Sequence, residues 1–388
     1  MTGALGIADP EFMEDEEIAI FNDAVGKFFD QHLDEKRLQK WEETGQCDRE
    51  FWREAGEAGL LGVSVPTEYG GHGGDFRHDM VVVQQTGLKG ASGFNASLHN
   101  VIVVPYVVRH GTEEQKKKWL PKMVSGELIT AIAMSEPGVG SDLQSITTTA
   151  TKDGNGYRLN GSKTFISNGQ VGNFIIVVAK TDPKERAKGI SLMCLETEGA
   201  EGFSRGRKLD KIGLDSSDTS ELFFDNVFVP ADNVLGGEEG RGFYQLMGEL
   251  GQERLIIAAG AVMTIEKALE TTLEYTKQRK AFGQTVWDFQ NTQFVLADLK
   301  ARGMAAKALL NDCIAKHLKG ELDPNAAAAA KYLCTELQGE VVDKCLQFHG
   351  GWGYINEYPI AKMFRDSRIT RIFGGSNEIM KMLIARGM

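Results

Sequence analysis

Hydrophobic and polar residues change their spacing twice along the chain, and each change marks a predicted domain boundary. From residue 14 to residue 128, apolar positions recur at helical intervals, for example at Phe21, Val25, Phe28 and Phe29. Residues 112–115, Thr-Glu-Glu-Gln, have the pattern of a capping box and predict a helix that runs toward Met123. The first segment is therefore predicted to be helical.

The second segment, residues 129–235, has the pattern of β-strands. Short runs rich in β-branched and aromatic residues predict strands at residues 147–151, 157–161, 174–179 and 222–229, the last ending at Pro230. Turn signals separate them at Asp153-Gly154, Asn160-Gly161 and Asn168-Gly169. This segment is predicted to form an antiparallel sheet or a small barrel.

The third segment, residues 236–388, returns to helical spacing and keeps it. Asp323 followed by Pro324 and a run of alanines is typical of a helix N-terminus. Long helices with short breaks indicate a helical bundle. The chain is therefore predicted to be an α+β protein with a helical domain, a β domain and a helical bundle in that order.

Charge and cysteine content narrow the possible partners. The net charge of −11 argues against nucleic acid or an anionic membrane as the main partner, and a polyanionic ligand would need locally placed cations. No apolar run approaches the roughly 20 residues that span a bilayer. Without CxxC spacing, a disulfide framework or zinc site is not expected, and a reducing compartment such as the cytoplasm fits the five cysteines, Cys47, Cys194, Cys313, Cys334 and Cys345.

The first 13 residues lack the positive and apolar regions of a secretory signal. They are expected to be a disordered leader or an addition from cloning, and they are left out of the predicted domains.

Two stretches carry candidate chemistry. Residues 133–142, Ala-Met-Ser-Glu-Pro-Gly-Val-Gly-Ser-Asp, combine flexible glycines with hydroxyl donors, and an ordinary tight loop is the alternative. A dinucleotide-binding turn is excluded because the third glycine and the preceding βαβ unit are missing. Residues 347–354, Gln-Phe-His-Gly-Gly-Trp-Gly-Tyr, place a glycine pair between helical segments, where a flat ligand or another chain could approach the backbone.

Together these stretches resemble the two signatures of the acyl-CoA dehydrogenase family. Further matches lie at residues 163–169, 278–283 and 373–379, and the resemblance covers the chain from about residue 14. The sequences of residues 349–354, 357–362 and 374–379 are most similar to those of the long-chain branch. The resemblance implies a C-terminal four-helix bundle and an oxidoreductase that uses FAD in fatty acid β-oxidation.

The resemblance also implies which residues hold the cofactor. FAD would lie between the β domain and the bundle, with Met134, Ser135, Phe165 and Ser167 near its flavin ring and Ser141 near the coenzyme A thioester. Many relatives carry tryptophan where this chain has Phe165. The rest of FAD would be held, partly from a neighbouring subunit, by Arg279, Gln290, Gln347, Gly350, Gly351, Ser376 and Glu378. A surface charge is the alternative for Arg279.

Most relatives place the glutamate that acts as the catalytic base where this chain has Gly374. In the long-chain and isovaleryl branches the glutamate lies on an earlier helix, and residues 252–257 match that segment. The resemblance therefore implies that Glu253 takes the α-proton, with Arg254 assisting, while flavin N5 takes the β-hydride. A solvated charge pair at a helix start is the alternative for Glu253 and Arg254, and Glu378 is the rival base.

The substrate is expected to be a long-chain acyl-CoA, converted to the trans-2-enoyl-CoA. Tyr244, Gly251, Gly374 and Gly375 are candidate substrate-lining residues, although Tyr244 would alternatively be a core residue. The implied partners are an electron-transfer flavoprotein and three further copies in a homotetramer. Alternatives are a branched or bulky acyl-CoA, an oxidase or monooxygenase on the same fold, and a non-catalytic acyl-CoA-binding paralogue.

Overall fold

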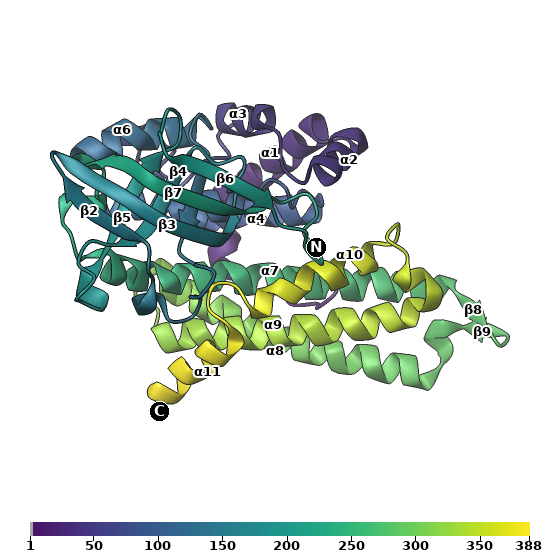
Figure 1. Cartoon of the computed structure of the whole chain (residues 1–388). Helices are drawn as coiled ribbons and strands as arrows, with labels where there is room; N and C mark the ends of the chain where they lie inside the picture. The colour runs from purple at the N-terminus through teal and green to yellow at the C-terminus, as the bar shows by residue number, and fades with distance from the viewer. Residues whose placement is uncertain (1–2) are drawn as a thin grey trace. The chain divides into compact units, whose positions relative to one another are not determined.

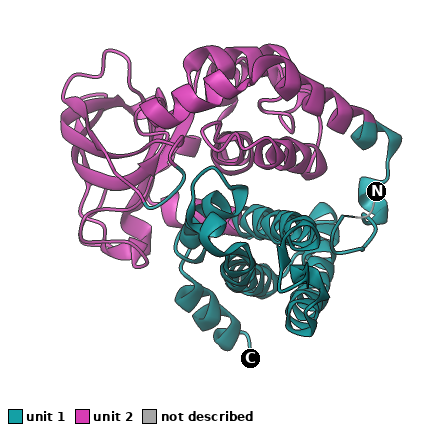
Figure 2. Ribbon diagram, turned by 90° about the vertical axis from the view of Figure 1, so that its right-hand side faces the viewer, with its two compact units in different colours: residues 1–19, 212–214, 251–388 teal, residues 20–211, 215–250 magenta. Residues whose placement is uncertain are grey.

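Residues 3–388 are described by a computed structural model, and they divide into two compact units (Figure 2). Unit 1 comprises residues 3–19, 212–214 and 251–388, and unit 2 comprises residues 20–211 and 215–250. The predicted order of helical segment, β segment and helical bundle is confirmed along the chain (Figure 1).

The N-terminal segment is helical, as its apolar spacing predicts. Its helices are α1 (Glu16–His32), α2 (Glu35–Thr44), α3 (Arg49–Glu57), α4 (Phe76–Leu88), α5 (Val104–His110) and α6 (Glu113–Val124), and a π-helix (Ser97–Val103) precedes α5. The capping box is confirmed, because the Gln115 backbone N–H donates to Thr112 Oγ1 at 3.3 Å and the Thr112 N–H donates to Gln115 Oε1 at 3.1 Å. The start of α6 is thus specified locally.

The β segment of unit 2 forms a mixed sheet. Its strands are β1 (Thr130–Ala133), β2 (Thr149–Asp153), β3 (Gly156–Ser167), β4 (Phe174–Lys180), β5 (Ile190–Glu196), β6 (Phe203–Lys208) and β7 (Thr219–Pro230). The pairs β2–β3, β3–β7, β6–β7 and β4–β5 are antiparallel, as predicted. β1 pairs with β4 in parallel instead, because the β2–β3 hairpin intervenes in the sequence and supplies the long crossover that parallel pairing needs.

The predicted turn at Asn160-Gly161 is wrong, since β3 continues through it. The pairing of β3 with β7 shifts register between Leu159 and Gly161, so the glycine lies in a β-bulge. A Cβ on Gly161 would come within 2.5 Å of Thr148 Oγ1, and its φ of +147° is unusual for other residues. The glycine signal therefore marked a close backbone approach inside a strand.

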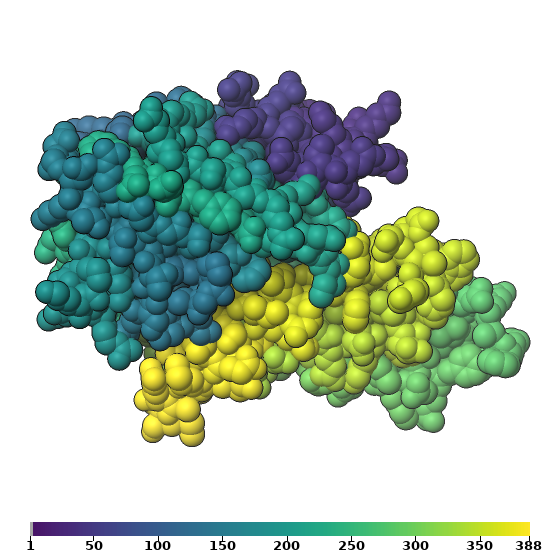
Figure 3. All heavy atoms as spheres, viewed as in Figure 1, coloured from purple at the N-terminus to yellow at the C-terminus, as the bar shows by residue number. Residues whose placement is uncertain are grey.

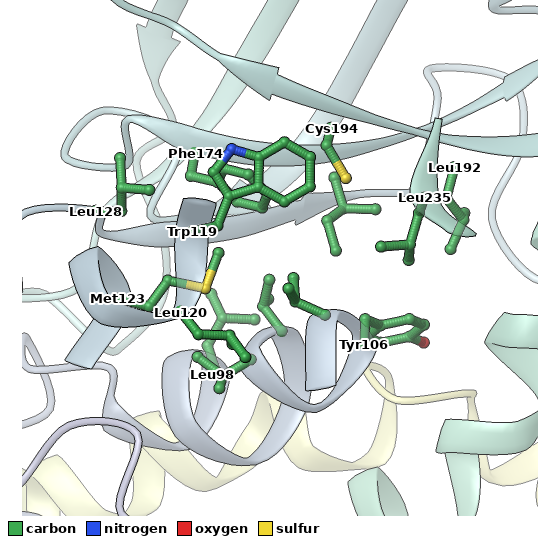
Figure 4. Close-up of a cluster of buried hydrophobic side chains, with 14 of the residues drawn as sticks. Leu98, Tyr106, Trp119, Leu120, Met123, Leu128, Phe174, Leu192, Cys194 and Leu235 are labelled. Atoms are coloured by element: carbon green, nitrogen blue, oxygen red, sulfur yellow. The ribbon is translucent and has the colours of Figure 1, made fainter. Parts of the chain in front are cut away.

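The core of unit 2 lies between the sheet and helices α5 and α6. Trp119 and Phe174 meet edge to face with ring centroids 5.0 Å apart, and aliphatic side chains from β5 extend the cluster (Figure 4). Strand β4 is buried at every position except its last, which explains its uninterrupted apolar sequence. A second cluster packs β3 against β7 through Leu159, Ile166, Leu222 and Phe224. The two clusters support the end of β1 and the strand β3, where the candidate flavin residues lie.

Unit 1 contains the predicted bundle and the end of the chain. Its elements are α7 (Gly242–Gln278), which begins in unit 2, a hairpin of β8 (Lys280–Ala281) and β9 (Gln284–Thr285), α8 (Gln290–Leu318), α9 (Pro324–His349), α10 (Pro359–Ser367) and α11 (Asn377–Arg386). The predicted cap of α9 is confirmed, because the Asn325 N–H donates to Asp323 Oδ1 at 3.0 Å. Within residues 3–388, every helix is too short or too polar to cross a membrane.

The described part of the expected leader, residues 3–13, packs into unit 1. Leu5 is fully buried, and a Cβ on Gly303 of α8 would come within 2.6 Å of Leu5 Cδ2. Lys307 of α8 also pairs with Asp9 at 3.8 Å. This differs from the expected disordered leader, because the absence of a side chain at Gly303 leaves space on α8 into which Leu5 packs.

Candidate functional site

Unit 2 brings the predicted flavin-contacting residues together. Met134 and Ser135 follow the end of β1, and Phe165 and Ser167 lie on β3. The Thr164 backbone N–H donates to the Ser135 carbonyl oxygen at 3.0 Å, which ties the two segments directly. Met134, Ser135 and Ser167 are half-buried, so their polar groups remain accessible to a ligand.

Phe165 has an unusual backbone. Its φ is +59°, a left-handed conformation that costs an aromatic residue roughly 1–3 kcal/mol, and its side chain is 69% exposed. The strain arises at a second bulge in β3, where the register shifts between Lys163 and Ile166. A strained, exposed aromatic ring held by a buried strand is typical of a ligand contact.

The glycine-rich loop that follows β1 is open. A Cβ on Gly138 or Gly140 would meet nothing within 4 Å, and neither residue has a positive φ. Their special backbone freedom is therefore not used, contrary to the reasoning from sequence, and the openness of the loop is what they provide. Ser141 at its end is exposed.

In unit 1, Glu253 and Arg254 lie well inside a helix. α7 begins at Gly242, and the two side chains are only 4% and 6% exposed. The alternative of a solvated pair at a helix start is therefore wrong. Burial lowers the pKa of Arg254, and the neighbouring charge of Glu253 opposes that shift. Arg254 Nε has no hydrogen-bond partner among residues 3–388, which leaves a buried donor available beside the candidate base.

Gly374, which stands where most relatives have the catalytic glutamate, lies against the side of α7 that carries Glu253. A Cβ on Gly374 would come within 2.3 Å of Ile257 Cδ1, and Ile257 lies four residues after Glu253, one helical turn away. Gly374 and Gly375 have φ values of +62° and +87°. The loop that carries the glutamate in most relatives thus approaches the helix face that carries Glu253, in a conformation suited to glycine.

Gly374→Ala is expected to lower the free energy of unfolding by about 1–3 kcal/mol, because alanine is disfavoured at a positive φ. Adding Ile257→Val to Gly374→Ala removes Cδ1. The double variant should recover only the part of the lost stability that is due to crowding. Gly248→Ala on α7 is the matched control, since a Cβ there meets nothing within 4 Å, and it should stabilise slightly. Equal urea midpoints for Gly374→Ala and wild type would contradict this reading.

A buried lysine that sequence reasoning missed holds this loop. Lys331 of α9 is fully buried, and its Nζ donates to the Gly375 carbonyl at 2.8 Å and to Asn377 Oδ1 at 2.9 Å. Burial lowers the pKa of Lys331 to about 8, and the charge of Arg254 acts in the same direction. Two buried cations therefore lie near each other in unit 1. Asn377, in the Gly-Gly-Ser-Asn-Glu motif, was the sequence signal available for this network.

Ser376 and Glu378 lie at a polar pocket of about 390 Å³. Ser376 caps α11, and the pocket is lined by Tyr332, Glu336, Arg368, Arg371, Ile372, Ser376, Asn377, Glu378 and Lys381. Its three cationic side chains stand beside two carboxylates, and two of them are paired, Arg371 with Glu336 at 3.5 Å and Lys381 with Glu378 at 3.9 Å. Glu378 itself is exposed, and a hydrogen bond with its own backbone N–H lowers its pKa, so it lacks the burial that raises the pKa of a base.

The other predicted cofactor residues of unit 1 lie at the opposite end of α7. From Glu253 to its last residue, Gln278, the helix extends about 38 Å at 1.5 Å per residue. Arg279 follows α7 directly, and Tyr275 Oη donates to the His349 carbonyl at 3.2 Å, which brings Gly350 to the same end. Arg279, Gln290, Gln347, Gly350 and Gly351 are all exposed there. Within unit 1, this group of cofactor residues is therefore far from the group that contains Ser376 and Glu378.

Two further residues of α7 refine the prediction. Tyr244 is 49% exposed, so the alternative that it is a core residue is wrong. Glu249, which sequence reasoning missed, is buried one turn before Glu253, where it pairs with Arg109 and accepts from His110 Nε2 at 2.9 Å. This carboxylate is occupied in joining α7 to α5. This ion pair was not visible in the sequence, because Arg109 and His110 lie about 140 residues before Glu249 along the chain.

Comparison with known proteins supports one family over the whole chain. The acyl-CoA dehydrogenase N-terminal, middle and C-terminal domains match residues 15–127, 131–227 and 240–388. The chain is 48% identical to the mitochondrial long-chain specific acyl-CoA dehydrogenase of Sus scrofa, covering 95% of this chain and 85% of that one. It is 37% identical to the mitochondrial isovaleryl-CoA dehydrogenase of Solanum tuberosum, covering 94% and 89%.

A solved structure gives the same result. An acyl-CoA dehydrogenase from Geobacillus kaustophilus superposes with a TM-score of 0.93 at 45% identity, covering 96% of this chain and 98% of that one. The domain order, the bulged β3 and the glycine loop beside α7 now have a common explanation. The chain belongs to the acyl-CoA dehydrogenase family of flavin-dependent oxidoreductases.

Proposed function

We propose that this protein oxidises long-chain acyl-CoA to the trans-2-enoyl-CoA with FAD, and that Glu253 removes the α-proton. The observation that carries the proposal is the approach of Gly374 to Ile257, one turn from Glu253. The face of α7 that meets the vacated base position therefore carries a buried carboxylate. The proposed base replaces the missing one from a different element of the same unit.

The environment of Glu253 suits proton abstraction. The proton α to a thioester is weakly acidic, so its removal needs a carboxylate that is held in position at the reacting carbon. Glu253 is 4% exposed, and Arg254 beside it supplies a buried positive charge and an available N–H donor. When bound, FAD supplies the acceptor for the β-hydride.

The residues present fit FAD. The exposed ring of Phe165, fixed at a positive φ, offers an apolar face for a flat flavin, although it lacks the indole N–H of tryptophan. Arg368, Arg371 and Lys381 line the pocket beside Ser376. Arg371 and Lys381 are paired with Glu336 and Glu378 there, so Arg368 is the proposed cationic contact for a phosphate group. Met134, Ser135, Ser141 and Ser167 are the proposed polar contacts in unit 2.

A long-chain substrate is favoured over a branched one. The long-chain relative is 48% identical, whereas the isovaleryl relative is 37% identical. Glycines at 374 and 375 also leave little side-chain bulk in the loop that approaches α7. Gly251 is not required by crowding, because a Cβ there would meet Leu322 at an ordinary 3.6 Å. Tyr244, with its ring half exposed, is retained as a proposed substrate contact.

Anaerobic mixing of the purified protein with a panel of straight and branched acyl-CoAs tests this proposal. A long-chain acyl-CoA should bleach the visible flavin absorption fastest. Faster bleaching by isovaleryl-CoA would favour the branched alternative, and binding without bleaching would favour a non-catalytic paralogue. Sustained oxygen consumption with peroxide release, in air and without another acceptor, would favour an oxidase.

An electron-transfer flavoprotein is the proposed electron acceptor. A reducing compartment such as the cytoplasm is the proposed location.

A homotetramer, built as a dimer of dimers, is proposed for the assembly. The two groups of cofactor residues in unit 1 are separated by most of the length of α7, so a second copy would have to supply Arg279 and its neighbours. Large apolar side chains are exposed at that end, with Phe282 97% and Tyr354 88% exposed. Phe282 lies in the turn between β8 and β9, and this hairpin is in the green region of the space-filling view (Figure 3).

Phe282→Asp is expected to weaken the assembly, because it places a charge in the proposed apolar contact. Light scattering should give a tetrameric mass for wild type and a smaller mass for the variant, with loss of FAD on dilution. Ile20→Asp, on α1 and 64% exposed, is a control that should stay tetrameric. A monomeric wild type that retains FAD would contradict the proposed assembly.

A further inference from the structure

Lys163 is a fully buried lysine beside the candidate flavin residues, and the proposed reaction does not use it. Its side chain has no exposed surface, and that of its partner Glu136 is 2% exposed. Lys163 Nζ donates to Glu136 Oε1 at 3.0 Å and to the Met134 carbonyl oxygen at 2.9 Å. A buried charge of this kind is costly, so its presence calls for a role.

The pair joins three segments of unit 2. Glu136 accepts hydrogen bonds from the backbone N–H groups of Thr147 at 2.7 Å and Thr148 at 2.9 Å, just before β2. Lys163 belongs to β3, and Met134 follows β1. Burial opposes the charge on Glu136, but Lys163 and the threonine donors lower its pKa to about 2. Burial lowers the pKa of Lys163 to about 8, against the attraction of Glu136.

Global stability is a weak reason for this arrangement. Buried ion pairs contribute little over apolar residues of the same volume, because removing both charges from water offsets their attraction. Their best-attested use is to select one arrangement of neighbouring segments. The segments selected here are the loop after β1 and the bulge of β3.

The bulge places Lys163 and Phe165 in complementary roles. Lys163 and Thr164 both point inward, so the bulge turns Phe165 outward with its φ of +59°. On the far side, Asn168 is buried and its Nδ2 donates to the Thr130 carbonyl at 3.0 Å. Phe165 is thus strained between two buried anchors, and both anchors bind backbone carbonyls at the ends of β1. Without the first anchor, the strained bulge could relax.

We propose that Lys163 is a positioning residue that holds the Met134–Ser135 backbone and the Phe165 bulge in the geometry that binds the flavin ring. This inference rests on the proposed function, since it assumes that FAD binds there. Lys163 acts through the Met134 carbonyl and through the adjacent Thr164–Ser135 hydrogen bond, without touching the substrate.

Lys163→Met in the full-length protein tests the inference, because methionine fills much of the space but donates no hydrogen bond. FAD release from the purified variant should be about tenfold faster than from wild type, as expected for loss of a charge-assisted hydrogen bond. The visible circular dichroism of the bound flavin should change. Flavin reduction by acyl-CoA should slow by up to about 10²-fold with little change in KM, because the substrate contacts are intact.

Two further variants separate positioning from folding. Lys152→Met removes an exposed lysine of β2 that pairs with Glu239 at 2.8 Å, and it should match wild type in every readout. Glu136→Gln keeps the Lys163 donor to Met134 and should give a smaller change than Lys163→Met. If Lys163→Met does not fold, faster FAD release and altered flavin dichroism in Glu136→Gln are the required result.

The outcomes distinguish the inference from the proposed function. A wild type that binds no FAD overturns the proposed function itself. If wild type binds FAD and Lys163→Met behaves like Lys152→Met, the role of Lys163 alone is overturned. If Lys163→Met does not fold, the same conclusion follows when Glu136→Gln behaves like Lys152→Met. Loss of thermal stability in a folded Lys163→Met with unchanged flavin dichroism and FAD release also overturns it, because that pattern indicates a structural role.

Discussion

Glu253→Gln is expected to slow flavin reduction by about 10²–10⁴-fold, the usual loss when a general base is removed. Glutamine has the same shape but cannot accept the α-proton. FAD content and the thermal unfolding midpoint should stay close to those of wild type, because the side chain keeps its size at a site that is 4% exposed. Anaerobic stopped-flow mixing with a long-chain acyl-CoA measures the rate.

Two other glutamates of unit 1 serve as comparisons. Glu270→Gln makes the same change on the same helix, where the side chain is 59% exposed and pairs with Lys267, and it should leave the rate unchanged. Glu378→Gln tests the rival base and should alter FAD binding more than proton removal. A wild-type rate for Glu253→Gln together with a large loss for Glu378→Gln would reverse the assignment.

Asn377→Ala should lower the free energy of unfolding by about 2–4 kcal/mol, because it leaves buried donors without partners. Asn377 is 1% exposed, accepts from Lys331 Nζ at 2.9 Å, and donates to Thr335 Oγ1 at 3.0 Å and to Glu336 Oε1 at 2.7 Å. Loss of the amide removes one of the two acceptors of the buried Lys331 ammonium group, whose remaining acceptor is the Gly375 carbonyl at 2.8 Å. Urea unfolding of the FAD-bound protein measures the change.

The control for Asn377 is Asn291→Ala, which removes an exposed asparagine from α8 in the same unit. It should change the free energy of unfolding by less than about 0.5 kcal/mol. An Asn377→Ala variant as stable as Asn291→Ala would show that the Lys331 network is not holding the loop.

Local signals predicted much of the fold. The capping box at Thr112 and the cap at Asp323 involve atoms only a few residues apart, so the sequence alone specifies them. The glycine at 161 was misread because a turn and a bulge share the same local requirement for backbone freedom. Only the pairing of β3 with β7, more than 60 residues away, decides between them.

The candidate site was predictable to the extent that motifs carry it. The vacancy at Gly374 pointed to Glu253, and both lie at the same face of α7 through Ile257. The two buried lysines were not predictable, because lysine is usually exposed and their partners are distant. Glu136 lies 27 residues before Lys163, and Asn377 lies 46 residues after Lys331. Such pairs become visible only when the strands and helices are assembled.

Proton removal by Glu253 can be measured apart from hydride transfer. An acyl-CoA analogue with sulfur in place of the β-carbon has no β-hydride to give, but its α-protons can still exchange with deuterium oxide. Nuclear magnetic resonance of the analogue should show enzyme-dependent exchange with wild type and with Glu270→Gln, and little or none with FAD-loaded Glu253→Gln. Exchange by Glu253→Gln at the wild-type rate would contradict the assignment of Glu253 as the base.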